Sequence, residues 1–382
     1  MEDGGQDSVR RRFTFDPNLL LVVLFSLFAI GPLLQPGYPW EAHDARHSVY
    51  FLFEFDQGIQ EGNLYPRWQP DFAFGYGYPF FNIYGPLSTY VGEAFYLLGL
   101  SFTGAVKAVL ALSVVGSGLA MYGFVKQVLG RRAGLVAAVA YMVIPYRLVD
   151  LYVRTALAES VAYVFVPLVL WGVWATLYRP RLANVLGLAL AYAALLVTHP
   201  LTALLLTIIL VFYIAVLALA RVNDGQPWRR LSWSSLWALL GHLGNVLFPT
   251  ALGLVLGLGL SASSLLPAMT ENIFVRVDQW YGGRYAWGGD FVEFFQLFSP
   301  RWGFGTSVPG PDDEISFQLG AVPIILSLLA LVPLFSQTLR ARLSPPARRL
   351  TAFFAVLTGI VVYLMLGVSA PLISSLKIDQ IL

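Results

Sequence analysis

The segment EAHDARH, residues 41–47, combines two histidines with an aspartate and follows the first long apolar run of the chain. His43 and His47 are spaced i and i+4, so on a helix they would share one face, as the zinc ligands of an HExxH site do. That interpretation lacks the usual glutamate and an identifiable third ligand. The alternative is a carboxylate, Asp44, that accepts a proton from an attacking hydroxyl group. The rest of the chain has to decide between the two.

Further side chains suited to chemistry occur in three later segments. They are Arg147, Asp150, Arg154 and Glu159 in YRLVDLYVRTALAES, His199 in THP, and Arg276 among the aromatic residues of the segment 267–318. Guanidinium groups suit bidentate contacts to phosphate, and carboxylate oxygens suit hard divalent cations. The structural alternatives are a salt-bridged loop around Arg154 and Glu159, a capped turn at His199 and an ordinary aromatic belt around Arg276.

The elements that carry these residues are predicted to lie in a membrane. The chain has 382 residues, of which 57% are hydrophobic and 12% charged, and its mean hydropathy is +0.67. Its apolar runs match the roughly 20 helical residues that cross a hydrocarbon core, whereas short alternating segments do not recur. The composition therefore predicts an all-α polytopic membrane protein. A net charge of only +2 implies no nucleic-acid partner, and without cysteine the chain has no thiol chemistry.

About nine transmembrane helices are predicted, preceded by a cytoplasmic tail at 1–18. The expected spans are 19–34, 105–125, 133–145, 161–177, 185–197, 201–220, 246–266, 319–335 and 351–370. The first run follows Arg10, Arg11 and Arg12 but has no small-residue cleavage site after it, which favours an uncleaved span over a signal peptide.

Basic residues orient this arrangement, because Lys and Arg favour the cytoplasmic side of a membrane. With nine spans and the N-terminus inside, every basic cluster falls on the cytoplasmic side, provided that the stretch 84–100 does not cross. That stretch contains Pro86 and Glu93 and is predicted to lie in the interface, as is a second helix at 228–243. Two long outer loops result, 35–103 and 267–318, together with a short outer loop around Arg147 to Glu159, and nearly all acidic residues are expected on the outer side.

The first outer loop is predicted to contain interfacial helices. Val49, Leu52, Phe53 and Ile59 indicate an amphipathic helix from about residue 41 to residue 60. The following segment is rich in proline, glycine and aromatic residues. Its GYGYP motif, residues 75–79, lacks the Lys and Ser/Thr of a phosphate-binding loop and is predicted to be a structural turn.

The order of these motifs resembles that of the GT-C superfamily of membrane glycosyltransferases. The resemblance rests on the early HD pair at residues 43–44, the later GYPFFNIYGPL, YRLVDLYVRTALAES and THP segments, and RWGFGTSVPGPDDEISFQLG in the late loop. It is similar above all to the bacterial membrane proteins labelled 6-pyruvoyl-tetrahydropterin-synthase-related and to the YfhO-like group, and it covers most of the chain. Members of these families usually continue with further spans, so we expect this chain, which stops at LKIDQIL, to be truncated at its C-terminus.

The resemblance implies transfer of a sugar from a polyprenyl-phosphate carrier to a glycan, lipid or protein acceptor, with Asp44 as base or metal ligand. It places the protein in the cytoplasmic (plasma) membrane, among membrane lipids, with its active site on the outer face. His43, Arg147, Arg154, Glu159, His199 and Arg276 are the expected substrate-binding residues. A magnesium or manganese ion on Asp44, Asp150 and Glu159 stays open. The rival functions are a non-catalytic transporter or flippase for lipids or lipid-linked sugars, and an assembly factor.

Overall fold

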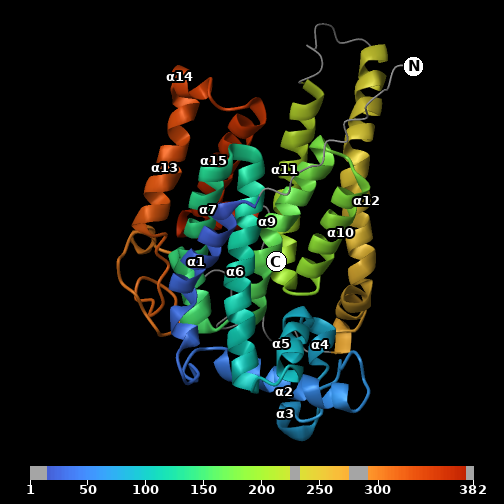
Figure 1. The fold of residues 1–382 in the computed structure, drawn as a ribbon, viewed down its shortest axis with the longest axis vertical. Coiled ribbons are helices and arrows are strands. Elements are labelled where there is room, and N and C mark those ends of the chain that lie inside the picture. The colour runs from blue at the N-terminus through green and yellow to red at the C-terminus, as the bar shows by residue number, and fades with distance from the viewer. Residues whose placement is uncertain (1–14, 224–232, 275–290, 376–382) are drawn as a thin grey trace, which may run out of the picture.

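A computed structural model describes residues 15–223, 233–274 and 291–375, and within these ranges the protein is built from helices (Figure 1). The described residues form no strand, only three isolated bridges between pairs of extended residues. Six helices are long and apolar enough to cross a membrane, or seven when one bent pair is taken as a single span. The protein is therefore an all-α integral membrane protein, as the composition predicts.

Each of the nine predicted spans coincides with a helix. The six long ones are α1 (Pro17–Ile30, continued by a 3-10 turn to Leu34), α6 (Phe102–Leu129), α9 (Leu157–Tyr178), α11 (Pro200–Asn223), α12 (Trp233–Thr270) and α15 (Pro345–Met365). Two others, α10 (Leu182–Leu196) and α13 (Ala321–Phe335), have 15 residues each. At 1.5 Å per residue they measure about 22 Å, less than the ~30 Å hydrocarbon core. A count of nine spans thus stays a prediction.

The remaining predicted span is α7 (Arg131–Val143), which continues beyond a sharp bend. After Ile144 the chain turns by 44° and forms α8 (Pro145–Val149), followed by a wider π turn, Asp150–Arg154. Pro145 explains the break, since its ring removes a backbone donor and fixes φ at the first position of the new helix. The short loop predicted around Arg147 to Glu159 is wrong, because residues up to Arg154 are helical and Glu159 lies in the first turn of α9.

The first long loop contains helices, as predicted, and there are four of them. They are α2 (Ala45–Gln60), α3 (Phe72–Gly75), α4 (Phe80–Ile83) and α5 (Leu87–Leu97). With 11 residues, α5 is about 16 Å long and too short to cross a bilayer. The condition that 84–100 does not span therefore holds in this structure. The GYGYP motif is a turn, with Gly75 and Gly77 at φ 84° and 80° and two backbone hydrogen bonds joining Gln69 and Tyr78.

The separate interfacial helix predicted at 228–243 is wrong for residues 233–243. These residues belong to α12, which runs without interruption for 38 residues, about 57 Å. No proline stands between Trp233 and Phe248, and the glycines there do not break the helix. Residues 228–232 lie outside the described ranges.

Two apolar cores hold the bundle together. One joins α9, α10 and α11, and the other joins α1, α6 and α7 with Leu52 of α2 and Leu151. Short elements complete the late part of the chain: Asn272–Phe274, Phe294–Leu297, α14 (Gln337–Arg340), Gly367–Ser369 and α16 (Ala370–Ser375).

The two ends of the bundle differ in chemistry. In Figure 1, α2 to α5 lie at one end and α14 at the other. At the end opposite α2, the half-exposed Lys126 and Arg131 contact Asp16 at 2.5 and 3.7 Å, and Tyr122 donates to the same carboxylate at 2.7 Å. The hydrogen bonds from Lys126 and Tyr122 lower the pKa of Asp16 to about 2. This network ties the start of α1 to the basic end of α6.

Candidate functional site

Asp44 lies where α2 meets the end of the bent helix pair. The backbone N–H groups of His43 and Asp44 donate to the carbonyls of Val153 and Arg154 at 3.1 and 2.7 Å. Those carbonyls are free to accept because Thr155 takes a left-handed conformation, φ 54° and ψ 41°, and ends the helix there. The structure therefore brings together the HD pair and the YRLVDLYVR segment, which are about 110 residues apart in the sequence.

The Asp44 side chain is half-buried and stands at the N-cap position of α2. An N-cap aspartate commonly accepts a hydrogen bond from the first turn of its helix. Here the side chain makes no such cap bond. Its carboxylate is thus not used to cap the helix that it precedes.

The Arg154 cluster consists of Tyr146, Asp150, Arg154 and Glu159. Nη1 of Arg154 donates to Asp150 at 2.6 Å, to Glu159 at 2.7 Å and to the Tyr146 hydroxyl at 3.0 Å, and Tyr146 donates to the other Glu159 oxygen at 3.0 Å. The three contacts of Arg154 all use one of its nitrogens. No described residue bonds Nε or Nη2, and the side chain keeps 29% exposure. Arg154 therefore has donors left for a phosphate group.

Tyr84 and His199 face the same charges. Burial raises the pKa of Tyr84, and so do the negative charges of Asp44 and Glu159, whereas Arg154 lowers it. Burial lowers the pKa of His199, which also senses Glu159 and Arg154. The His199 ring is fixed through Nδ1, which lies 2.7 Å from the Thr202 hydroxyl oxygen. Both side chains thus lie within electrostatic reach of the Arg154 cluster.

His43 contacts the late loop instead of the Arg154 cluster. Its Nε2 lies 3.0 Å from the carbonyl oxygen of Gly305. The loop is held in shape by buried Asp313, which accepts hydrogen bonds from Gln296, Ser307 and the Val308 backbone at 2.8 to 2.9 Å. Segment 291–319 therefore closes over the start of α2 through His43. Arg276, predicted to bind substrate, lies outside the described residues.

Arg147 is not placed as predicted. Its side chain is fully buried, donates to Ser113 at 2.8 Å and lies 4.4 Å above the Tyr163 ring. Its helical position explains this, because α8 turns it towards α6 and α9 rather than outwards. Within the described part of the chain, Nε and Nη1 of Arg147 and Oδ2 of Asp150 have no hydrogen-bond partner. A fully buried arginine cannot meet a substrate from the surface.

The described residues contain no group of three or more His, Cys, Asp or Glu side chains that could hold a metal ion. Asp150 and Glu159 each direct one carboxylate oxygen at the single guanidinium group of Arg154. The carboxylate set Asp44, Asp150 and Glu159 is thus not assembled as a metal site. The same holds for zinc at the HD segment, where His47 stacks on Phe51 with ring centroids 6.0 Å apart while His43 contacts Gly305.

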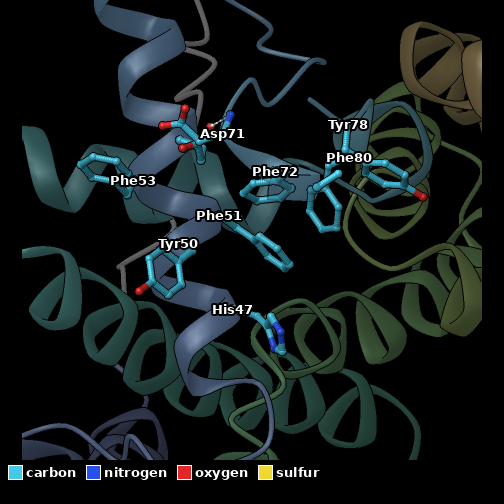
Figure 2. A pocket seen from close by; sticks show the side chains of 10 residues that line it. His47, Tyr50, Phe51, Phe53, Asp71, Phe72, Tyr78 and Phe80 are labelled. Carbon is cyan, nitrogen blue, oxygen red and sulfur yellow. Dashed lines mark hydrogen bonds between the residues drawn. The ribbon is translucent and has the colours of Figure 1, made fainter. Parts of the chain in front are cut away.

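A cavity of about 610 Å³ lies along α2, within the size range of small-molecule sites (Figure 2). From α2 it is lined by His47, Tyr50, Phe51, Phe53 and Glu54, and from the following segment by Asp71, Phe72, Ala73, Tyr78 and Phe80. We call it the α2 cavity. The GYPFFNIYGPL motif supplies three of its neighbours, Tyr78, Phe80 and Tyr84.

Aromatic contacts connect the α2 cavity to the Arg154 cluster. Phe51 packs on Phe80 with ring centroids 4.0 Å apart, and Phe80 stacks on Tyr84 at 4.8 Å. Tyr84 in turn senses the charges of Asp44, Glu159 and Arg154. The cavity and the cluster are therefore adjacent parts of one region at the α2 end of the bundle.

Comparison with known proteins gives little functional guidance. No family model matches the chain. An uncharacterized protein of Lactococcus lactis subsp. cremoris (strain MG1363) is 23% identical over 237 residues, which are 60% of this chain and 38% of the relative. The match thus spans less than two-fifths of that protein.

Proposed function

We propose that this protein is a glycosyltransferase of the GT-C type, which moves a sugar from a polyprenyl-phosphate carrier to an acceptor at the outer leaflet of the cytoplasmic membrane. The observation that carries the proposal is the 2.7 Å hydrogen bond between the Asp44 backbone and the Arg154 carbonyl. It joins the backbones of Asp44 and Arg154, and Tyr84 senses the charges of both side chains, a half-buried carboxylate and a guanidinium group with donors to spare. Those are the two groups that such a transfer needs.

The chemistry assigned to them is direct displacement at the sugar. The acceptor hydroxyl oxygen forms a bond to the anomeric carbon, and the bond from that carbon to the phosphate oxygen breaks. The electron pair leaves with the carrier phosphate, and the hydroxyl proton goes to Asp44 as general base. Arg154, through Nε and Nη2, stabilises the charge on the departing phosphate, and His199 is a further contact for that phosphate.

The surroundings agree with a lipid-linked donor. Exposed apolar side chains occur at the C-terminal end of α5, where Leu97 and the following Leu98 are 68% and 78% exposed. A polyprenyl chain needs such a surface next to the site that binds its phosphate. The Asp16 network lies at the opposite end of α6, so the expected cytoplasmic charges are remote from this surface.

Transport of a lipid-linked sugar is the second candidate, and one observation favours it. Arg147 and Asp150 are fully buried in a helix pair that counts as a possible span. Ionisable residues inside a membrane segment often mark a substrate or ion pathway. The sequence alone did not suggest this, because those residues were expected in an outer loop.

The test uses purified protein in vesicles that contain a polyprenyl-phosphate sugar labelled in the sugar, with a membrane fraction as source of acceptor. We expect Asp44→Asn and Asp44→Ala to slow release of the unglycosylated carrier by at least about 100-fold, the usual weight of a general base. Glu61→Gln, which changes an exposed carboxylate at the other end of α2, is the matched control and should leave the rate unchanged.

Full activity in both Asp44 variants would remove Asp44 from the mechanism. The transporter would be favoured if the labelled lipid moves across the vesicle membrane without release of the carrier, and if Asp44→Ala moves it equally well.

A further inference from the structure

The α2 cavity has aromatic walls. Phe51, Phe72 and Phe80 form a mutually packed group, with centroids 4.0 to 5.8 Å apart, and Tyr50 and Tyr78 add two phenols. Figure 2 shows Phe51 directed from α2 towards Phe72 and Phe80, whereas Tyr50 projects from another side of the helix. Flat apolar rings with few polar neighbours suit a ligand with alternating apolar faces and polar edges.

Its polar lining includes two carboxyl groups, those of Glu54 and Asp71. Glu54 is 4% exposed and accepts a long hydrogen bond, 3.5 Å, from the Asp71 backbone. Burial is the main cause that raises the pKa of Glu54, and the charge of Asp71 adds to it. No lysine or arginine is among the described residues that line the cavity. Carboxyl groups accept hydrogen bonds from hydroxyls and repel anions, so this lining selects a neutral polyhydroxyl ligand over a phosphorylated or acidic one.

The cavity is aligned with Asp44. Positions 44, 47, 51 and 54 follow the spacing i+3, i+4, i+3, which places them on one face of α2. At 1.5 Å per residue, Glu54 lies about 15 Å along the helix from Asp44, and His47 lies about one turn from it. A chain of sugar rings lying on this face would point one end at the proposed base.

We propose that the α2 cavity binds the neutral sugar end of an acceptor glycan and presents its terminal hydroxyl to Asp44. The inference rests on the proposed function and gives its acceptor a chemical class. It also assigns the two substrates to different ends of the region. The phosphate of the donor lies at cationic Arg154, and the uncharged glycan lies on the acidic aromatic face of α2.

The test measures binding without donor, by saturation-transfer NMR on the full chain in nanodiscs. Maltotriose, chitotriose and mannotriose are the neutral probes, and maltotriose with a terminal phosphate is the anionic one. We expect transfer from aromatic protons to at least one neutral probe and none to the phosphorylated one. Tyr50→Ala should weaken that binding roughly fivefold, the loss of about one aromatic contact.

Two controls make the result specific. Tyr76→Ala removes an 87% exposed tyrosine outside the cavity lining and should not change binding, whereas 61% exposed Tyr50 lines the cavity. Glu54→Gln keeps the shape of the side chain but makes it neutral, and should let the phosphorylated probe bind.

Absence of transfer to every neutral probe would overturn the inference, as would equal binding of the phosphorylated probe or equal effects of Tyr50→Ala and Tyr76→Ala. These outcomes do not depend on catalysis. If wild-type protein binds a neutral probe but never releases carrier, the proposed function fails and the cavity assignment stands.

Discussion

The Arg154 cluster and the α2 cavity lie next to each other, but their charges are handled in opposite ways. In the cluster, one guanidinium nitrogen contacts two carboxylates and a phenol within 3.0 Å, so both carboxylates have a cationic partner inside the protein. In the cavity, Glu54 faces apolar rings and lacks a cationic partner among the lining residues. The Arg154 cluster is therefore held together by ionic contacts, whereas the α2 cavity is formed by apolar rings and hydrogen-bond acceptors.

The largest effect should come from breaking the cluster. Arg154→Ala leaves fully buried Asp150 without its cation, and removal of one partner of a buried ion pair typically costs about 3–5 kcal/mol. We expect a clear drop in the melting temperature in detergent together with loss of transfer. Arg154→Lys keeps the charge but not the fork of donors, so it should lie in between.

The matched control for this pair is Arg46→Ala. Arg46 is 64% exposed and lies 3.7 Å from a 95% exposed Glu41. An exposed pair of this kind contributes at most about 1 kcal/mol, so the melting temperature should hardly change. Equal drops in melting temperature for Arg46→Ala and Arg154→Ala would contradict the claim that the buried ion pair stabilises the protein more than the exposed one.

A smaller effect should come from the turn that supports the cavity. Gly77 has φ +80°, and a Cβ there would lie 2.2 Å from the Trp68 ring. Gly77→Ala should therefore destabilise the Gln69–Tyr78 turn by roughly 1–3 kcal/mol and weaken sugar binding, since Tyr78 lines the cavity. Thermal unfolding and the NMR assay would measure this.

Gly62→Ala separates the effect of backbone strain from the effect of the close Trp68 ring. Gly62 also has positive φ, +88°, but a Cβ there meets nothing within 4 Å. It should show backbone strain alone, with a smaller loss of stability and unchanged binding. If both alanine variants behave alike, the close approach of Trp68 is irrelevant to the cavity.

The smallest effect concerns pH. Glu93 of α5 is 4% exposed, and burial and the charge of Asp56 raise its pKa from 4.5 to about 7. A carboxyl group with a higher pKa in the folded than in the unfolded protein binds more protons when folded. Its stabilising effect is therefore complete below pH 4.5 and is lost as the pH rises through 7.

Glu93→Gln should remove this dependence. The wild-type melting temperature is expected to fall between pH 5 and pH 8 by more than that of the variant, with Glu61→Gln behaving as wild type. A wild-type protein that becomes more stable over this range in step with Glu93→Gln would exclude the effect.

The sequence predicted those features that depend on local patterns. Apolar runs gave helices at all nine predicted positions, the amphipathic spacing gave α2, and glycines at 75 and 77 gave the turn. The backbones of Asp44 and Arg154 meet, and both segments were expected at the same side of the membrane; that their side chains act together stays a prediction.

The features that depend on contacts distant in sequence were not predicted. Nothing local to Arg147 reveals that α8 buries it against Ser113 and Tyr163 after the bend at Pro145. The α2 cavity likewise exists only because Phe72 and Phe80 fold back onto α2. Local periodicity states which face of a helix is apolar, but it does not state what covers that face.

The most direct measurement of the central claim is an electron cryo-microscopy structure with a polyprenyl-phosphate sugar bound. The account predicts that the phosphate contacts Arg154, that the sugar lies between it and Asp44, and that the α2 cavity stays open for an acceptor. A carrier whose phosphate binds at the Asp16–Lys126 end of the bundle, or whose sugar lies away from Asp44, would contradict it.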